Sequence, residues 1–176
     1  IDDKIDIDQL VGKNKAIISI FAGSRISEIN VLMPILLNFI KLTKEKYNDI
    51  TFVFHSTREH SKIIQDYVKN SNLINCEVIS DQKIKTHLLK KSIFAVAKSG
   101  TVSLEICNAK IPSIILYKMN FINFLIIKML VKIKYANIIN IMSNEEIIPE
   151  LLQSNCNSKN IYKVVSKFLD NPSKLQ

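Results

Sequence analysis

The sequence predicts an α/β domain in which buried parallel strands alternate with helices. Short apolar runs without periodicity, such as Ile93–Ala97, are typical of strands that are covered on both faces. Between these runs lie stretches whose apolar residues recur every three or four positions, as on one side of a helix. Strands and helices that alternate in this way form right-handed βαβ units. We therefore expect one Rossmann-like open parallel sheet with flanking helices.

Length and composition fit one globular domain with a substantial core. The chain has 176 residues, of which 47% are hydrophobic. Its three cysteines are far apart and follow no disulfide or zinc-site spacing, which indicates a reducing compartment. The net charge of +8 admits nucleic acid, an anionic membrane surface or phosphorylated substrates as partners. Nucleic acid is the least favoured, because the sequence contains no aromatic-basic motif of a nucleic-acid module.

The opening segment differs in character from the rest of the chain. The sequence begins at Ile1 rather than Met, and residues 1–10 are acidic and have no signal-peptide pattern. We expect further residues before Ile1 and interpret residues 1–14 as a linker or the remnant of an interdomain segment. Residues 15–176 then form the single Rossmann-like domain.

Three strand-helix units are predicted in the first half of this domain. Each strand is a short apolar run that is followed by a turn and an amphipathic stretch. The strands are predicted at Ala16–Phe21, Thr51–His55 and Cys76–Ile79, and the helices at Ile29–Ile40, Glu59–Val68 and Asp81–Lys91. Pro34 lies within the first helical stripe, so this helix is either kinked or begins later than Ser27.

The second half continues the same alternation. The strand at Ile93–Ala97 leads into a helix after Gly100, and a further strand is predicted at Ser113–Leu116. A helical segment is expected at Glu145–Gln153, and a last helix at Ser158–Leu169.

The stretch Lys118–Lys134 combines large apolar residues with lysines. A helix needs about 20 mostly apolar residues to cross a bilayer, and lysines and asparagines interrupt this stretch too often. One interpretation is an interfacial helix on an anionic membrane surface, where each lysine contributes about 1 kcal/mol. The alternative is a helix that is buried in the core with a few exposed lysines. The sequence favours neither.

A small polar turn, Ser99-Gly100-Thr101, separates the strand at Ile93–Ala97 from the helix that follows. Ser99 is suited to cap this helix, and Gly100 lets a ligand approach the backbone. Free N–H groups and the positive end of the helix dipole then favour a bound phosphate. Glu105 lies four residues after Thr101 and overlooks this site from the same helix face. The alternative is capping chemistry without a ligand, although a capping box would need Glu or Gln where valine stands at position 102.

A second polar turn, Gly23-Ser24-Arg25, closes the first strand, so both turns lie on one edge of a parallel sheet and face one cleft. The planar guanidinium of Arg25 suits a diphosphate, and hydrogen bonds to charged groups contribute about 1.5–3 kcal/mol. The alternative for Arg25 is a surface ion pair with Glu28, which contributes about 0.2–1 kcal/mol. Neither turn fits the glycine-rich loops of NAD- or ATP-binding proteins.

Other catalytic patterns find no support in the sequence. It contains no G-x-S-x-G nucleophile motif. His55, His60 and His87 have no carboxylate or cysteine at metal-ligand spacing. A lone histidine is usually structural, so these three receive no role.

Several motifs in a fixed order resemble one enzyme family. They are Gly23-Ser24-Arg25-x-x-Glu28, Ser99-Gly100-Thr101-x-x-x-Glu105, the apolar-basic stretch Tyr117–Tyr135, Asn140, and Glu146-x-x-x-Glu150-Leu151-Leu152-Gln153. From about Lys15 to Phe168, the chain is similar to the carboxyl-terminal half of lipid-A-disaccharide synthases. These enzymes are GT-B glycosyltransferases, in which two Rossmann-like domains face a cleft and the carboxyl-terminal domain binds the UDP-sugar donor.

The resemblance implies a donor-binding role in a hexosyl transfer. The family moves 2,3-diacylglucosamine from UDP to 2,3-diacylglucosamine 1-phosphate, which gives lipid A disaccharide 1-phosphate and UDP. The implied partners are UDP-2,3-diacylglucosamine, the acceptor sugar phosphate, an anionic membrane surface and an amino-terminal acceptor domain, without nucleic acid. The implied location is cytoplasmic, peripheral on the inner face of the bacterial inner membrane.

Site roles follow from the matched motifs. By resemblance, Gly23-Ser24-Arg25 approaches the diphosphate, and Ser99-Gly100-Thr101 holds phosphate at the helix start. Glu105 accepts hydrogen bonds from the ribose hydroxyls, and Asn140 is placed among the residues that bind the UDP-sugar donor. Arg25 is the expected catalytic residue, because its charge and the helix dipoles would stabilise the departing UDP. The resemblance implies no metal and no cofactor.

The chain departs from the family pattern beside both turns. The family usually has Leu-Pro before Gly-Ser-Arg, where this chain has Phe21-Ala22, and a small or hydroxylated residue where this chain has Lys98. The acceptor domain, with the presumed general base, lies outside this sequence. We therefore expect the chain alone to be incomplete: half of a split enzyme, an excerpt or a remnant. The alternatives are a non-catalytic or membrane-associated module and another UDP-sugar GT-B glycosyltransferase.

Overall fold

A computed structural model describes residue 7, residue 11 and residues 15–119 and 134–171. Within them, six strands form one sheet. The strands are β1 (Ala16–Phe21), β2 (Ile50–His55), β3 (Cys76–Ile79), β4 (Ser92–Lys98), β5 (Ser113–Tyr117) and β6 (Glu150–Leu152). They are hydrogen-bonded in the order β3-β2-β1-β4-β5-β6, and each neighbouring pair is parallel.

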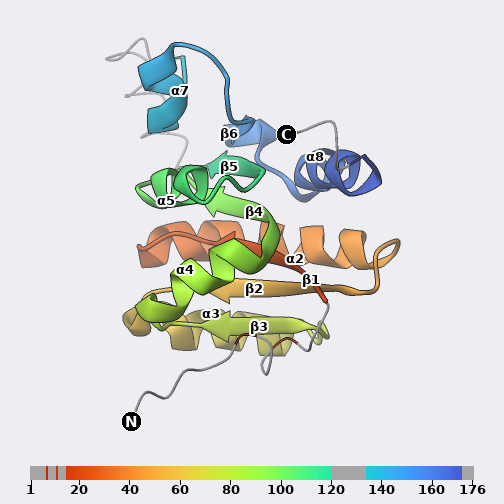
Figure 1. Cartoon of the computed structure of the whole chain (residues 1–176). Helices are drawn as coiled ribbons and strands as arrows, with labels where there is room; N and C mark the ends of the chain where they lie inside the picture. Colours follow the sequence, from red (N-terminus) through yellow and green to blue (C-terminus); the bar gives the residue numbers. More distant parts are fainter. Residues whose placement is uncertain (1–6, 8–10, 12–14, 120–133, 172–176) are drawn as a thin grey trace.

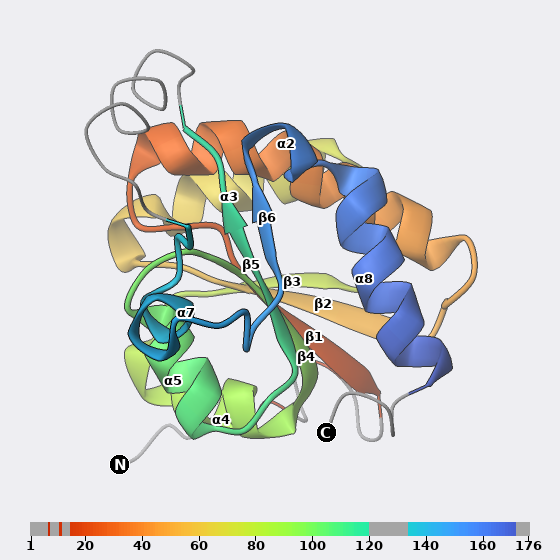
Figure 2. The same ribbon diagram turned by 90° about the horizontal axis from the view of Figure 1, so that it is seen from above.

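Helices follow the strands and cover both faces of the sheet. They are α2 (Ile26–Lys44), α3 (Arg58–Asn70), α4 (Gln82–Lys91), α5 (Val102–Asn108), α7 (Ile138–Ser143) and α8 (Ser158–Asp170), with a short 3-10 helix at Gln153–Asn155. α2, α3 and α8 lie on one face and α4 and α5 on the other, with α7 next to α5 (Figure 1, Figure 2). The predicted open parallel sheet with flanking helices is confirmed.

The central strands are apolar because both of their faces are covered. All six residues of β2 are buried, as are five of the six in β1. On the side of α2, the core includes Ile18, Phe52 and Phe94, while Ala95 and Ile115 belong to the core under α4 and α5. Burying one such large apolar side chain contributes about 1.5–3 kcal/mol, so these two layers supply most of the stability.

Ile7 and Val11 lie in the segment that is predicted to be a linker. Both are buried, and they form one cluster with Ile17 of β1, Val53 of β2 and Ile84 of α4. The segment therefore contacts the domain at these two positions. The division of the chain after residue 14 stays a prediction.

The order of the strands reverses between β1 and β4. β2 and β3 extend the sheet on one side of this pair, and β5 and β6 extend it on the other. Phe21 and Ala97 are paired near the carboxyl ends of the two strands. In open parallel sheets, ligands bind in the crevice outside such a switch point. The two polar turns of the sequence begin at this place.

Two helix starts differ from the alternatives or predictions made from the sequence. α2 begins at Ile26, so Pro34 lies inside the helix, and the alternative of a start after Ser27 is wrong. Thr101 rather than Ser99 precedes the first residue of α5, and the Ser99 hydroxyl donates to the carbonyl oxygen of Ala136 instead of accepting an N–H of this helix. The prediction that Ser99 caps this helix is therefore wrong.

The helix predicted at Glu145–Gln153 is also wrong. The helix of this region is α7, which forms earlier: Asn137 caps it with its side chain, and Asn144 ends it in the left-handed conformation at φ 54°. The following residues run to β6, and the carbonyl of Pro149 accepts the N–H of Ile115 at 2.9 Å. The helical conformation is sterically disfavoured for a residue that precedes proline, here Ile148, and this helps the chain to extend into β6.

The apolar-basic stretch Lys118–Lys134 lies mostly outside the described residues, so both interpretations of it stay predictions. Among the helices that the structure describes, α2 alone is long and apolar enough to cross a membrane. Seven of its residues are buried, and it packs on the sheet as a core helix.

Candidate functional site

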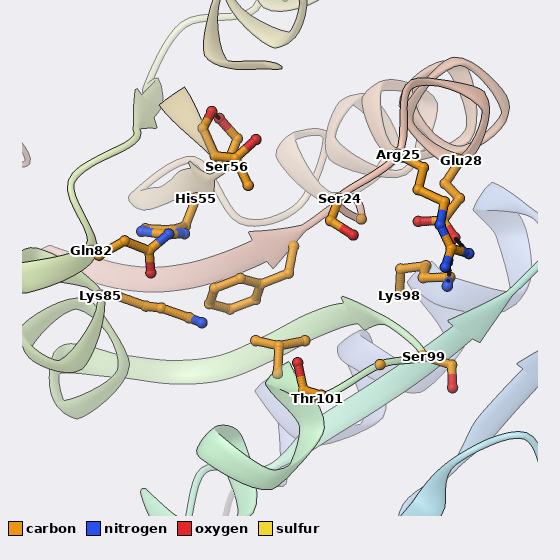
Figure 3. Close-up of a pocket in the computed structure, with 15 residues that line it drawn as sticks. Ser24, Arg25, Glu28, His55, Ser56, Gln82, Lys85, Lys98, Ser99 and Thr101 are labelled. Atoms are coloured by element: carbon orange, nitrogen blue, oxygen red, sulfur yellow. Dashed lines mark hydrogen bonds and ion pairs between the residues drawn. The ribbon is translucent and has the colours of Figure 1, made fainter. Parts of the chain in front are cut away.

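A pocket of about 320 Å³ opens at the carboxyl ends of β1, β2 and β4 (Figure 3). Both polar turns line it, together with residues that follow β2 and residues of α4. The lining consists of Phe21, Gly23, Ser24, Arg25, Glu28, His55, Ser56, Thr57, Gln82, Lys85, Lys98, Ser99, Gly100, Thr101 and Val102. The prediction that the two turns face one cleft is confirmed.

The first turn requires glycine at position 23. Gly23 has a φ of +111°, a conformation that residues with a side chain rarely adopt. A Cβ atom at this position would lie 2.7 Å from Oε2 of Glu28. The chain therefore turns from β1 into α2 directly beneath the Glu28 side chain, so any other residue would be strained by this φ and would require the Glu28 side chain to move.

Arg25 lies at the rim of the pocket, and 78% of its side chain is exposed. Its Nη1 donates to Oε1 of Glu28 at 3.3 Å, so the ion pair considered as the alternative is present. The same carboxylate oxygen lies 2.8 Å from Nζ of Lys98, and these two side chains are only 14% and 17% exposed. An exposed pair contributes about 0.2–1 kcal/mol, so an anionic ligand can readily replace Glu28 as the partner of Arg25.

The second turn is anchored at Ser99 and open at Gly100. Ser99 donates its N–H to the carbonyl of Leu116 at 2.8 Å and its hydroxyl to the carbonyl of Ala136 at 2.7 Å. A Cβ atom on Gly100 would have its nearest described neighbour, the carbonyl oxygen of Lys98, at 4.0 Å. The space at Gly100 is therefore available to a ligand, as expected of a backbone that a phosphate approaches.

Lys85 of α4 connects the pocket to Glu105. Its Nζ donates to Oε1 of Glu105 at 2.6 Å and lies 5.9 Å from the ring centre of Phe21. Lys85 lines the pocket, whereas Glu105 is not part of the lining. The contact of Glu105 with a ribose stays a prediction, and it requires Lys85 and the ribose to share one carboxylate.

Sequence reasoning missed His55 and Lys85 as pocket residues. His55, the last residue of β2, is buried, and its Nε2 lies 3.2 Å from the carbonyl oxygen of Asp81. Burial lowers the pKa of His55, against the opposing effect of the contact with Asp81. The only signal for His55 in the sequence is that it ends a predicted parallel strand, because all such residues lie on the same sheet edge as both turns.

Asn140 lies outside the pocket lining and is fully buried. Its Nδ2 donates to the carbonyl of Ile148 and to Oε1 of Glu150, both at 2.7 Å. Its Oδ1 accepts the N–H groups of Ile147 and Ile148, both at 2.9 Å. These contacts favour a structural role in the loop between α7 and β6 over the predicted contact with the donor. Glu146 also faces this loop, where its Oε1 accepts the N–H of Glu150 at 3.3 Å.

The charges of the lining favour an anionic ligand. Three cationic side chains, those of Arg25, Lys85 and Lys98, stand against the one carboxylate of Glu28. The lowered pKa keeps His55 neutral near pH 7, so it does not change this balance. No group of His, Cys, Asp and Glu residues in the described part of the chain is arranged to hold a metal ion. That the site works without a metal stays a prediction.

The chain is similar to known proteins over nearly its whole length. A family model described as lipid-A-disaccharide synthetase matches residues 2–176. The lipid-A-disaccharide synthases of Rickettsia prowazekii (strain Madrid E) and Sulfurihydrogenibium sp. (strain YO3AOP1) are 34% and 35% identical over 165 and 167 residues. These matches cover 93% and 90% of the chain but 43% of each relative, so the chain spans less than half the length of these proteins.

Solved structures of low sequence identity share the fold. ADP-heptose LPS heptosyltransferase II of E. coli superimposes with a TM-score of 0.66 at 9% identity, over 94% of this chain and 50% of that one. The UDP-GlcNAc 2-epimerase from Neisseria meningitidis, solved with bound UDP-GlcNAc, gives 0.61 at 18% identity, over 96% and 40%. The C-terminal domain of a group 1 glycosyl transferase from Francisella tularensis gives 0.57 at 17% identity, over 91% and 77%.

Proposed function

The chain belongs to the lipid-A-disaccharide synthetase family, and we propose that it forms the donor-binding part of this glycosyltransferase. The proposed reaction moves 2,3-diacylglucosamine from UDP to 2,3-diacylglucosamine 1-phosphate and yields lipid A disaccharide 1-phosphate and UDP. The observation that carries the proposal is the basic pocket at the switch point of the sheet, where the two turns that resemble family motifs meet. An amino-terminal domain would supply the acceptor side of the reaction.

The diphosphate of the donor is proposed to lie between the two polar turns. Gly100 leaves space at its backbone, and the side chains of Arg25 and Lys98 lie in the same pocket lining. Glu28 holds both cations in the absence of ligand. A diphosphate would bind Arg25 in place of Glu28, because the exposed ion pair of Arg25 contributes little and bidentate, charge-assisted hydrogen bonds to phosphate oxygens are strong. Lys98 would keep its partly buried pair with Glu28 and add positive charge beside the diphosphate.

Arg25 is the proposed catalytic residue. During the transfer, the bond between the anomeric carbon and the diphosphate oxygen breaks, and negative charge develops on the departing UDP. A guanidinium that is already in place stabilises this charge, and loss of one such donor typically lowers the rate by about 100- to 1,000-fold. Arg25 suits this role because its exposed side chain is held only by Glu28 among its described contacts. The proposed site needs neither a metal nor another cofactor.

The proposed location is the inner face of the bacterial inner membrane, because both proposed sugar substrates carry acyl chains. Ile138, Ile141 and Met142 of α7 support this proposal, with exposed fractions of 44%, 48% and 79%. Apolar residues of this kind bind the interfacial layer of a bilayer. In a flotation assay, the chain should rise with anionic vesicles, and its absence from the vesicle fraction would remove this part of the proposal. The alternative, a non-catalytic membrane module, predicts vesicle binding without UDP binding.

Isothermal titration with UDP tests the donor site. The parent chain should bind UDP, and Arg25→Ala and Glu105→Ala should each weaken the affinity by about tenfold or more, since each removes a hydrogen bond to a charged group. Lys62→Ala and Glu45→Ala are matched controls, because both residues are exposed and lie outside the pocket lining. Tight UDP binding that is insensitive to both site variants, or no UDP binding at all, would refute the proposed function.

A further inference from the structure

The carboxylate of Glu150, at the start of β6, collects three hydrogen bonds from the segment before α7 and from α7 itself. Its Oε2 accepts the N–H of Ala136 at 2.8 Å. Its Oε1 accepts the N–H of Asn137 at 2.9 Å and Nδ2 of Asn140 at 2.7 Å. Both oxygens are therefore engaged, and one carboxylate fixes two successive peptide groups and one amide.

Ala136 connects this carboxylate to the second turn of the pocket. Its N–H is held by Glu150, and its carbonyl accepts the Ser99 hydroxyl at 2.7 Å. Ser99 in turn precedes Gly100, whose backbone is the open part of the pocket. A continuous path of two hydrogen bonds thus runs from β6 to the turn proposed to hold phosphate.

The position of Glu150 is itself fixed from two sides. β6 pairs with β5, where Glu150 lies opposite Ile115. On the other side, the fully buried Asn140 uses its amide to hold the backbone of Ile147 and Ile148. The carboxylate is therefore presented by a strand that pairs with the sheet and follows a loop held by α7, which makes it a rigid support for Ala136.

We propose that Glu150 is a positioning residue for the donor: through Ala136 it fixes the Ser99 hydroxyl, and thereby the phosphate-binding conformation of the turn at Ser99–Thr101. This proposal rests on the proposed function for its ligand. A carboxylate that only stabilised α7 would leave the turn as it is when it is removed. The two cases therefore differ in what happens at the turn Ser99–Thr101, away from β6 and α7.

Glu150→Gln and Ser99→Ala break the path at its two ends. The amide of Gln keeps the size of the side chain, but one of its two acceptor oxygens becomes a donor that faces an N–H group. Ser99→Ala removes the hydroxyl, and Ser99→Thr retains it as the conservative variant. Glu145→Gln is the matched control, because the described hydrogen bonds of Glu145 involve only its backbone.

Two measurements on the full chain test the proposal. The first is amide hydrogen exchange without ligand at residues 99 and 103, whose N–H groups donate to the carbonyls of Leu116 and Gly100. The second is UDP affinity. Glu150→Gln and Ser99→Ala should each raise exchange at the turn by about tenfold and weaken UDP binding by about 5- to 20-fold. Ser99→Thr and Glu145→Gln should resemble the parent. The double variant should bind UDP about as well as the weaker single variant, because both changes break one path.

Unchanged exchange of the amides of residues 99 and 103 in both variants would overturn the proposal, as would fully additive losses of affinity. If Glu150→Gln does not fold, Ser99→Ala compared with Ser99→Thr still decides whether the hydroxyl fixes the turn. If the parent chain binds no UDP, the proposed function fails, but the exchange measurement still decides whether Glu150 orders the turn.

Discussion

The turns after β1 and β4 both combine glycine with serine at the edge of one pocket, yet they are built differently. Gly23 has a φ of +111° and lies beneath the carboxylate of Glu28, so the fold itself demands a glycine. Gly100 has no such backbone conformation, and a Cβ atom there would meet its nearest described neighbour at 4.0 Å. The first glycine is thus explained by the folded chain alone. No described neighbour explains the second, and we propose that it leaves room for a bound phosphate.

The partners of the two turns follow the same division. The first turn is covered by Glu28, which also pairs with Lys98 at 2.8 Å with both side chains mostly buried. The second turn is held by Ser99 at its base, through Leu116 and Ala136, while its tip stays open. One turn therefore serves mainly to shape the pocket, and the other is proposed to receive the ligand.

Gly23→Ala should have the largest effect and should act on stability. A side chain at this φ is strained, and its Cβ would collide with the Glu28 carboxylate, so we expect the free energy of unfolding to fall by about 2–3 kcal/mol. Urea unfolding monitored by circular dichroism measures this change. Glu28→Ala combined with Gly23→Ala should recover the part that is due to the collision but not the part that is due to φ. An unchanged urea midpoint for Gly23→Ala would show that the first turn is not constrained in this way.

Gly100→Ala should leave stability nearly unchanged and act on binding. The backbone conformation tolerates alanine, so the free energy of unfolding should change by less than about 1 kcal/mol. The added methyl group would occupy the space proposed for phosphate, and UDP affinity in isothermal titration should fall about tenfold or more. Equal UDP affinities for the parent and this variant would break the comparison, because the second turn would then have no ligand role.

The strands of this fold could be predicted from the sequence because each is a short apolar run between polar turns. Ala16–Phe21 and Cys76–Ile79 have the predicted bounds, and the parallel alternation then brings both turns to one edge. The segment from α7 to β6 could not be predicted in this way. Its conformation depends on Glu150 reaching back to Ala136 and on the pairing of β6 with β5, and such distant contacts leave no periodic pattern.

The same limit applies to single residues of the pocket. Arg25 could be found because it ends a recognisable polar turn. Lys85 is one of four lysines on α4, and only the folded chain places it beside Phe21 and Glu105. His55 resembles any polar residue at the end of a strand until the sheet order puts β2 next to β1. Patterns thus identified the turns, whereas tertiary packing selected the side chains around them.

His55 sharpens the comparison with a third turn, the one after β2, and should give the smallest effect. Burial lowers its pKa in the folded chain, so the unfolded chain binds more protons between this value and the ordinary value of about 6.5. The contribution of His55 to stability is therefore complete above pH 6.5 and is lost as the pH falls through the lowered pKa. In urea unfolding at a series of pH values from 5 to 7.5, the parent should gain stability with rising pH more steeply than His55→Gln, whose amide can still donate to Asp81.

If the turn after β2 resembles the first turn, this pH dependence appears in the free energy of unfolding and not in UDP affinity. A pH-dependent UDP affinity that His55→Gln abolishes would instead assign His55 to the ligand-binding side of the pocket, together with Gly100.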